Sequence, residues 1–282
     1  MTGRRFSPRI AYLVFFLSGA ASLADEVVWF KWLHLTFGST TAAAATLLAV
    51  FMAGLALGSG VCARFAPRLS RPQWLYAALE TGIALYALAT PVVFSAIDAG
   101  YVWGYRHLGD SGATLLWIRI LLATAALLPP TFLMGATFPA LSRVVASRDA
   151  PGSRTAILYG INTTGAFVGT VVCGLWFIPW IGLRATLAAS AIASLLAALA
   201  AVSLAPQPLP PDEPARRPAR FLFWAIAALT GACAMANEVT WTRVLVLRLG
   251  SSVYAFALVL ALCLAGIVGG SLVGSRVRAR EL

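Results

Sequence analysis

The chain has 282 residues, of which 60% are hydrophobic and only 11% are charged, and its mean hydropathy is +0.84. Soluble domains carry about 25% charged residues, so this composition excludes an ordinary water-soluble globule and indicates a polytopic membrane protein. The formal net charge of +11 would suit nucleic-acid binding, but the 21 basic residues form no long basic run. We therefore expect a lipid bilayer as partner and no nucleic acid.

Eight apolar segments are long enough to cross a bilayer as helices. A helix rises about 1.5 Å per residue, so about 20 apolar residues span a hydrocarbon core about 30 Å thick. In chain order the segments are roughly Ile10–Leu35, Ala42–Ala63, Trp74–Ile97, Leu115–Leu141, Ala156–Pro179, Ala185–Leu204, Phe221–Val246 and Ser252–Gly274. Their hydrophobicity does not alternate as it would in the strands of a barrel. The sequence therefore predicts an all-α membrane bundle of about eight transmembrane helices.

Arginines gather on one side of the predicted spans. Five groups of three basic residues flank the spans on that side, which places fifteen of the 21 basic residues there. Cytoplasmic loops of membrane proteins carry the excess of positive charge. We therefore expect both termini in the cytoplasm, which agrees with an even number of spans.

An internal repeat links the beginning and the end of the chain. Residues 18–68 align without a gap onto residues 230–280, at a constant offset of 212 residues. Twenty-one of the 51 aligned pairs are identical, among them Glu26 with Glu238 and Trp29 with Trp241. A period of this length holds six spans, which is the organisation of transporters built from two parallel halves.

The repeat suggests three parts. We expect a first six-helix repeat at 1–204, a cytoplasmic linker at 205–220 in which six of sixteen residues are proline, and the first two helices of an incomplete second repeat at 221–282. A complete second repeat would need about 212 residues, but only 62 follow the linker (221–282). The pattern therefore predicts a short or split gene, or a fragment of something longer.

Five stretches carry a resemblance to a known family. They are SGAASLADEVVWFKWLHLTFGST (18–40), FMAGLALGS (51–59), LYAALETGIALYAL (75–88), LPPTFLMGATFPAL (128–141) and LYGINTTGAFVGTVVCG (158–174). On these stretches the chain resembles the membrane part of the fused transporter/spermidine synthase family. The resemblance implies a major-facilitator-like fold in a bacterial cytoplasmic (inner) membrane and a connection with polyamines.

In that family a soluble aminopropyltransferase domain follows the membrane part. The soluble Gly-rich loop that would hold the adenosyl-thioether cosubstrate has no counterpart in this sequence. We therefore expect no enzymatic activity and no cofactor from this chain alone.

Glu26 is the strongest candidate for a functional residue. A charged side chain deep in a bilayer costs at least about 2.5–3.5 kcal/mol, so it is expected to face the bundle interior or water. Its repeat equivalent, Glu238, lies on the corresponding helix face. One interpretation is a proton- or cation-binding pair with one carboxyl per repeat. The other is a structural hydrogen bond that ties helices together.

Further polar residues lie within the predicted spans. Asp25 aligns with Asn237, and both are candidates for solute or proton binding. Asp25 points about 100° away from Glu26 on a helix, so it could serve a separate partner or lie at the membrane interface. Glu80 lies inside the third span. Asn162 precedes a run of glycines, where an amide can bind a solute or a neighbouring helix.

Three basic residues are candidates for ion pairs inside the bundle. Lys31 and Arg243 follow the two repeat glutamates by five residues, too far around the helix to pair with them on the same helix. Arg119 could reach an acid on a neighbouring helix, or extend to the interface. The two histidines have no second ligand nearby in the sequence, so we expect no metal site.

Three functions follow from this reading. The first is a transporter-like module that uses Glu26, Glu80 and Glu238 to handle a small solute, which the resemblance suggests is a cation such as a polyamine. The second is a non-catalytic membrane anchor for a separately encoded, soluble synthase-like partner. The third is a truncated fusion whose aminopropyltransferase domain lies downstream.

Overall fold

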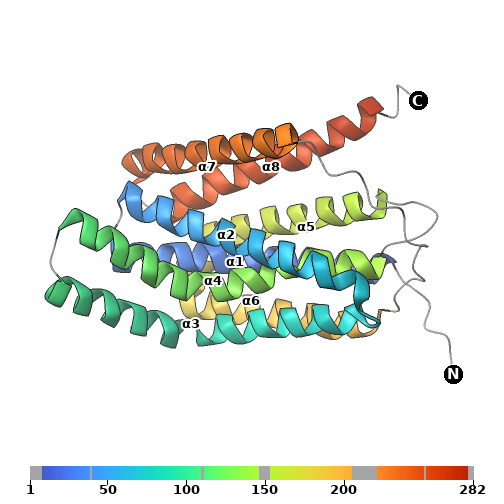
Figure 1. Cartoon of the computed structure of the whole chain (residues 1–282), viewed down its shortest axis with the longest axis horizontal. Coiled ribbons are helices and arrows are strands. Elements are labelled where there is room, and N and C mark those ends of the chain that lie inside the picture. The colour runs from blue at the N-terminus through green and yellow to red at the C-terminus, as the bar shows by residue number, and fades with distance from the viewer. Residues whose placement is uncertain are drawn as a thin grey trace.

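The computed structural model describes residues 8–38, 40–108, 111–145, 153–204, 221–250 and 252–278. These ranges contain helices and short turns but no strand. The α-helices, shown in Figure 1, are α1 (Pro8–Phe37), α2 (Thr41–Phe65), α3 (Pro72–Leu108), α4 (Gly112–Val145), α5 (Ser153–Val172), α6 (Ile178–Val202), α7 (Phe221–Leu249) and α8 (Ser252–Arg278). A 3-10 turn, η1 (Ala66–Arg68), follows α2, and a π-helix, η2 (Cys173–Phe177), joins α5 to α6. The all-α prediction is confirmed, while the proline-rich linker expected at 205–220 lies outside the described residues.

Seven uninterrupted helical stretches are long and apolar enough to cross a membrane. Six of them fall within single helices, and the seventh is the continuous stretch Thr155–Val202, which includes α5, η2 and α6. Their outward surfaces carry large apolar side chains such as Val92, Leu121 and Leu199, each more than 70% exposed. This is the architecture of a multi-pass helical membrane protein.

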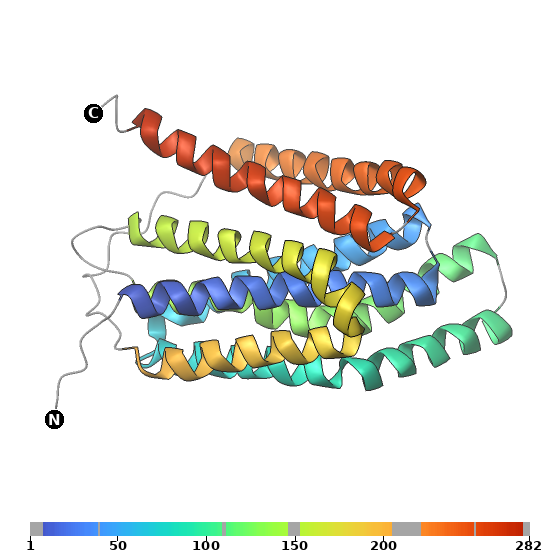
Figure 2. The same ribbon diagram turned by 180° about the vertical axis from the view of Figure 1, so that it is seen from behind.

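The connection between α5 and α6 differs from the sequence prediction of two spans separated by a loop. The chain stays helical through η2 and then changes direction at Gly182, whose φ of 80° and ψ of 173° are not helical. Glycine adopts a positive φ at no steric cost because it lacks a Cβ. α5 and α6 therefore run in opposite directions from a reversal of only a few residues, as Figure 2 shows.

α1 is the central helix, and it packs against α5 on one side and α6 on another. The contact with α5 is backbone to backbone: a Cβ on Gly165 would lie 2.1 Å from the Phe16 carbonyl oxygen, and one on Gly169 would lie 2.2 Å from that of Ala20. Small residues allow membrane helices to approach this closely. The glycines after Asn162 are thus explained by packing.

α3 continues eleven residues beyond the predicted end of the third span at Ile97 and, together with α4, projects past the other helices at one end of the bundle (Figure 1). Tyr101 anchors this extension, because its ring packs edge-on against Phe37 of α1 at 5.2 Å between centroids. The Arg119 side chain of α4 also contacts Tyr101. Aromatic and cationic side chains of this kind are typical of membrane–water interfaces.

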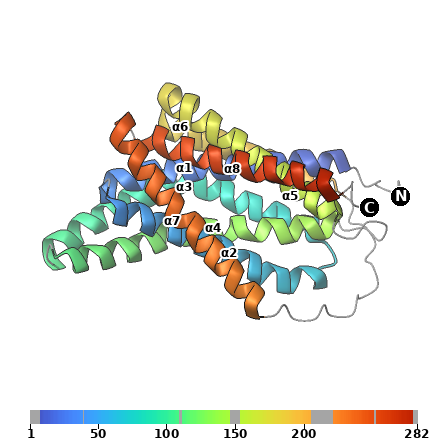
Figure 3. The ribbon, with the colours of Figure 1, turned by 90° about the horizontal axis from the view of Figure 1, so that it is seen from above.

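α7 and α8 lie together on one side of the bundle, and α7 crosses α2 obliquely when the bundle is seen from above (Figure 3). The contacts between the repeat copies are reciprocal, because α1 packs against α8 while α2 packs against α7. α8 also packs along α5. Both repeat copies therefore contribute to one interface.

Candidate functional site

The side chains of the two neighbouring acidic residues of α1 face different surroundings. Asp25 is 1% exposed and Glu26 is 4% exposed. Asp25 accepts a hydrogen bond from the Ser190 hydroxyl of α6, whereas Glu26 lines a small cavity together with residues of α2 and α4. The separation of about 100° between successive residues of a helix produces this division.

Asp25 belongs to a polar layer between α1, α3 and α6. Glu80 of α3 is fully buried, acts electrostatically on Asp25, and accepts a hydrogen bond from the Ser18 hydroxyl of α1. The hydroxyls of Tyr76 and Ser194 lie beside Glu80 without meeting hydrogen-bond geometry. Within the described residues, one oxygen of each acid, Asp25 Oδ2 and Glu80 Oε2, is buried without a hydrogen-bond partner.

Glu26 and Glu238 interact electrostatically across the interface between the repeat copies. Glu238 is 6% exposed, and its carboxyl acts electrostatically on that of Glu26. Among the residues that the structure describes, neither Glu26 Oε1 nor Glu238 Oε1 has a hydrogen-bond partner. Buried polar groups are normally paired, so two carboxyls left open at equivalent positions are an exception that calls for a reason.

A small cavity adjoins Glu26. Glu26, Trp29 and Leu48 border a cavity of about 10 Å³, and Leu48 also lines a larger cleft of about 360 Å³ between α2 and α7. We call this larger space the α2–α7 cleft; its lining residues are Ala45, Leu48, Ala49, Met235, Ala236, Val239 and Thr240. Leu48 thus lines both the cleft and the cavity at Glu26, and Val239, the residue that follows Glu238 in the chain, lies in the wall of the cleft.

The structure places the two predicted amides in different environments. Asn162 is half-buried against α1, where a Cβ on Gly19 would lie 2.3 Å from its carbonyl oxygen and 2.8 Å from its side-chain oxygen. Asn237 is exposed on α7, and its Nδ2 donates to the carbonyl oxygen of Cys233 at 3.1 Å. Neither amide is brought to the Glu26–Glu238 pair by a contact that the structure shows.

The three predicted ion-pair candidates also lie in different environments. A guanidinium nitrogen of Arg119 donates to the Tyr101 hydroxyl at 3.0 Å, and its carbon lies 5.8 Å from the centre of that ring. The partner that the structure shows for Arg119 is thus a tyrosine. Lys31 and Arg243, by contrast, converge electrostatically on His34.

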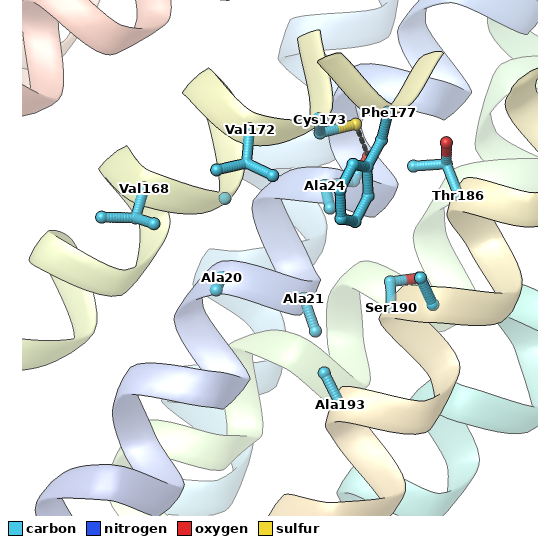
Figure 4. Close-up of a pocket in the computed structure, with 12 residues that line it drawn as sticks. Ala20, Ala21, Ala24, Val168, Val172, Cys173, Phe177, Thr186, Ser190 and Ala193 are labelled. Atoms are coloured by element: carbon cyan, nitrogen blue, oxygen red, sulfur yellow. Dashed lines mark hydrogen bonds between the residues drawn. The ribbon is translucent and has the colours of Figure 1, made fainter. Parts of the chain in front are cut away.

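A second pocket, of about 150 Å³, lies between α1, α5 and α6 close to η2 (Figure 4). Its walls are largely alanine, valine and glycine. Ser190 also lines the pocket, and its hydroxyl donates a hydrogen bond to Asp25. The Cys173 thiol donates to the carbonyl oxygen of Ala24 at 3.4 Å, as the dashed line shows. The only hydroxyls on the walls, those of Ser190 and Thr186, both make hydrogen bonds within the described helices.

Sequence reasoning overlooked the hydroxyl groups that partner these acids. Ser18, Ser190 and Ser194 were not recognised as neighbours of Asp25 and Glu80. Ser190 and Ser194 are separated by four residues and so share one helix face, which could have revealed a polar stripe on α6.

Comparison of the chain with protein-family models, with curated proteins and with solved structures found no match.

Proposed function

We propose that the chain is a transporter-like membrane module that moves a small cationic solute, or a proton, along the interface between its two repeat copies. The observation that carries this proposal is the pair formed by Glu26 and Glu238, which are buried, mutually repelling when ionised, and each open at one oxygen within the described part of the chain. Intramembrane acids are costly and commonly mark ion or proton pathways.

The chemistry of the pair suits a cation or a shared proton. Two carboxyls that interact strongly titrate as a unit, because the charge on one disfavours the charge on the other. A bound cation or a proton relieves the repulsion. The α2–α7 cleft beside the pair offers a route from the surface, and polyamines enter as the solute class through the family resemblance alone.

The proposal includes a membrane topology for the helices. We take α5 and α6 as two separate spans, which gives eight, and we assign α1–α6 to one major-facilitator-like half and α7–α8 to the start of another. The distribution of arginines supports cytoplasmic termini in a bacterial inner membrane. In keeping with an even number of spans, α1 begins and α8 ends at the same end of the bundle (Figure 2).

The test is flux through sealed vesicles that contain the purified protein. Uptake of labelled putrescine and spermidine would be followed with and without an imposed pH gradient. Wild type should show saturable uptake, and Glu26→Gln should abolish it while inserting normally. Asn237→Ala, an exposed change on α7, is the matched control and should retain uptake. Equal flux in Glu26→Gln and wild type would contradict the role of the pair.

A second function is that of a membrane subunit within a larger assembly. It is favoured by the outward face of α7, where a Cβ on Gly231 would meet no atom within 4 Å among the described residues. The equivalent Gly19 packs tightly against Asn162. Co-purification with a synthase-like enzyme, together with absence of flux in the vesicle assay, would favour this alternative.

A further inference from the structure

A small pocket lies at the end of the bundle where α1 meets α2 and α7 meets α8 (left in Figure 1). It has a volume of about 20 Å³, and a cavity needs about 10–15 Å³ to hold one water molecule. The residues that give it its chemical character are His34, Thr40, Thr41, Thr242 and Arg243. The pocket is thus large enough for one water-sized species, and both repeat copies line it.

The reciprocal packing of the two copies explains why the pocket exists. On one side of the interface, Phe30 of α1 stacks on Phe256 of α8, with ring centroids 3.7 Å apart and an angle of 6° between planes. At the offset of 212 residues, the equivalents of these two residues are Thr242 of α7 and Ala44 of α2, and both line the pocket. Two small side chains stand where the other side has two phenyl rings, so the space stays open.

Two buried side chains in the pocket have polar atoms without partners. His34 is 8% exposed and Thr242 is 4% exposed. Within the described ranges, the two ring nitrogens of His34 and the Thr242 hydroxyl have no hydrogen-bond partner. A neutral imidazole and a hydroxyl can each donate one hydrogen bond, and leaving such donors unpaired in a buried place is costly. The pocket is therefore lined by hydrogen-bond donors that have no acceptor among the described residues.

The electrostatic surroundings are positive. Arg243 lines the pocket, and Lys31 and Arg243 both act electrostatically on His34. α2 begins at Thr41 and is capped by Thr40, whose side chain accepts from the backbone N–H of Ala43 at 3.1 Å. The N-terminus of a helix carries a partial positive charge, and among the described lining residues there is no acid.

We propose that this pocket binds a single monovalent anion of about the size of chloride. The His34 ring and the Thr242 hydroxyl donate to the anion, while Arg243 and the N-terminus of α2 balance its charge. Because the ligands come from α1, α2 and α7, a bound anion ties the second repeat copy to the first. The site is separate from the Glu26–Glu238 pair and does not depend on the transport proposal.

The test is halide binding to the purified full chain, measured without any transport assay. The protein would be prepared in gluconate buffer at constant ionic strength and titrated with chloride or bromide while thermal unfolding is followed. Wild type should show a saturable rise in unfolding temperature. Thr242→Val keeps the side-chain shape but removes the donor, and it should weaken the apparent affinity about ten-fold or more.

The matched control is Thr230→Val, which makes the same change at an exposed position of α7, where the hydroxyl donates to the carbonyl oxygens of Ile226 at 2.9 Å and Ala227 at 3.0 Å. This variant should keep the wild-type halide response. A second measurement, anomalous scattering from bromide-soaked crystals, should place one peak between His34 and Thr242. Equal responses to chloride and gluconate, or a response that Thr242→Val shares fully with wild type, would overturn the proposal.

Discussion

Trp29 and Trp241 occupy equivalent positions in the two repeat copies, yet Trp29 is 1% exposed and Trp241 is 58% exposed. The difference lies in their neighbours. α1 is enclosed by helices of its own repeat copy, and Trp29 Nε1 donates to Thr90 Oγ1 of α3 at 3.0 Å. α7 instead presents Trp241 outward from the described bundle. The same residue in the same local sequence is therefore a core anchor in one copy and a surface residue in the other.

This contrast predicts unequal effects of the same substitution. Trp29→Phe should lower the free energy of unfolding by about 1–3 kcal/mol, because it removes buried volume and a buried hydrogen bond. Trp241→Phe should change it by less than about 0.5 kcal/mol, as is usual at exposed positions. Thermal unfolding of the two detergent-purified variants measures the difference. A comparable loss in both would show that α7 is packed as tightly as α1.

The glycines of α2 and α8 allow a second paired comparison. A Cβ on Gly58 would lie 1.9 Å from the Phe132 carbonyl oxygen of α4, whereas one on the equivalent Gly270 would meet no described atom within 4 Å. Gly58→Ala should therefore destabilise the bundle by about 1–3 kcal/mol through overpacking, and Gly270→Ala should be close to neutral. Unfolding temperature and yield after membrane extraction would test both variants. Tolerance of Gly58→Ala would mean that α2 and α4 can separate without cost.

The bond between Ser190 and Asp25 predicts a cost for removing its donor. Ser190→Ala would leave both oxygens of a buried carboxyl without a protein donor and should cost about 1–3 kcal/mol. Ser203→Ala, at the exposed residue that follows the last residue of α6, is the control and should cost little. Urea unfolding in mild detergent would compare them. If the two variants were equally stable, Asp25 would have to find another partner.

The Glu26–Glu238 pair predicts a trade between stability and function. Glu26→Gln removes a buried ionisable group on which the Glu238 carboxyl acts electrostatically, so it should raise the free energy of unfolding by about 1 kcal/mol or more while abolishing flux. Glu80→Gln should gain less, because one oxygen of Glu80 already accepts from Ser18. Unfolding temperatures of both variants provide the check. A loss of stability in Glu26→Gln would indicate that the pair is a structural tie rather than a functional site.

Several features of the fold could be predicted from local sequence alone. Long apolar runs identified the helices, since a backbone in hydrocarbon must satisfy its hydrogen bonds within the segment. The burial of Glu26, Glu80 and Glu238 followed from the cost of exposing an acid to lipid. The reversal at Gly182 falls between the two predicted spans, but the helical form of the connection was not predicted, because the π-helix η2 and one glycine replace the expected loop.

The partners of the acidic residues required the tertiary structure. Asp25 and Glu26 are adjacent in sequence, but Asp25 accepts a hydrogen bond from Ser190, 165 residues away, and Glu26 is under the electrostatic influence of Glu238 from the second copy. No helical period reveals which distant side chain stands opposite. The same holds for His34, which read as an isolated histidine near the end of a span until packing set it beside Thr242 and Arg243.

The amino-acid sequence by itself determined the membrane-spanning helices, the repeat and the depth of the acids, because hydropathy and helical spacing act within a segment. Only the tertiary structure decided which carboxyl oxygens remain open, which glycines are in close contact and where Thr242 and Ala44 leave a pocket. Those outcomes depend on the neighbours that each helix face meets, and equivalent sequences in the two copies meet different neighbours.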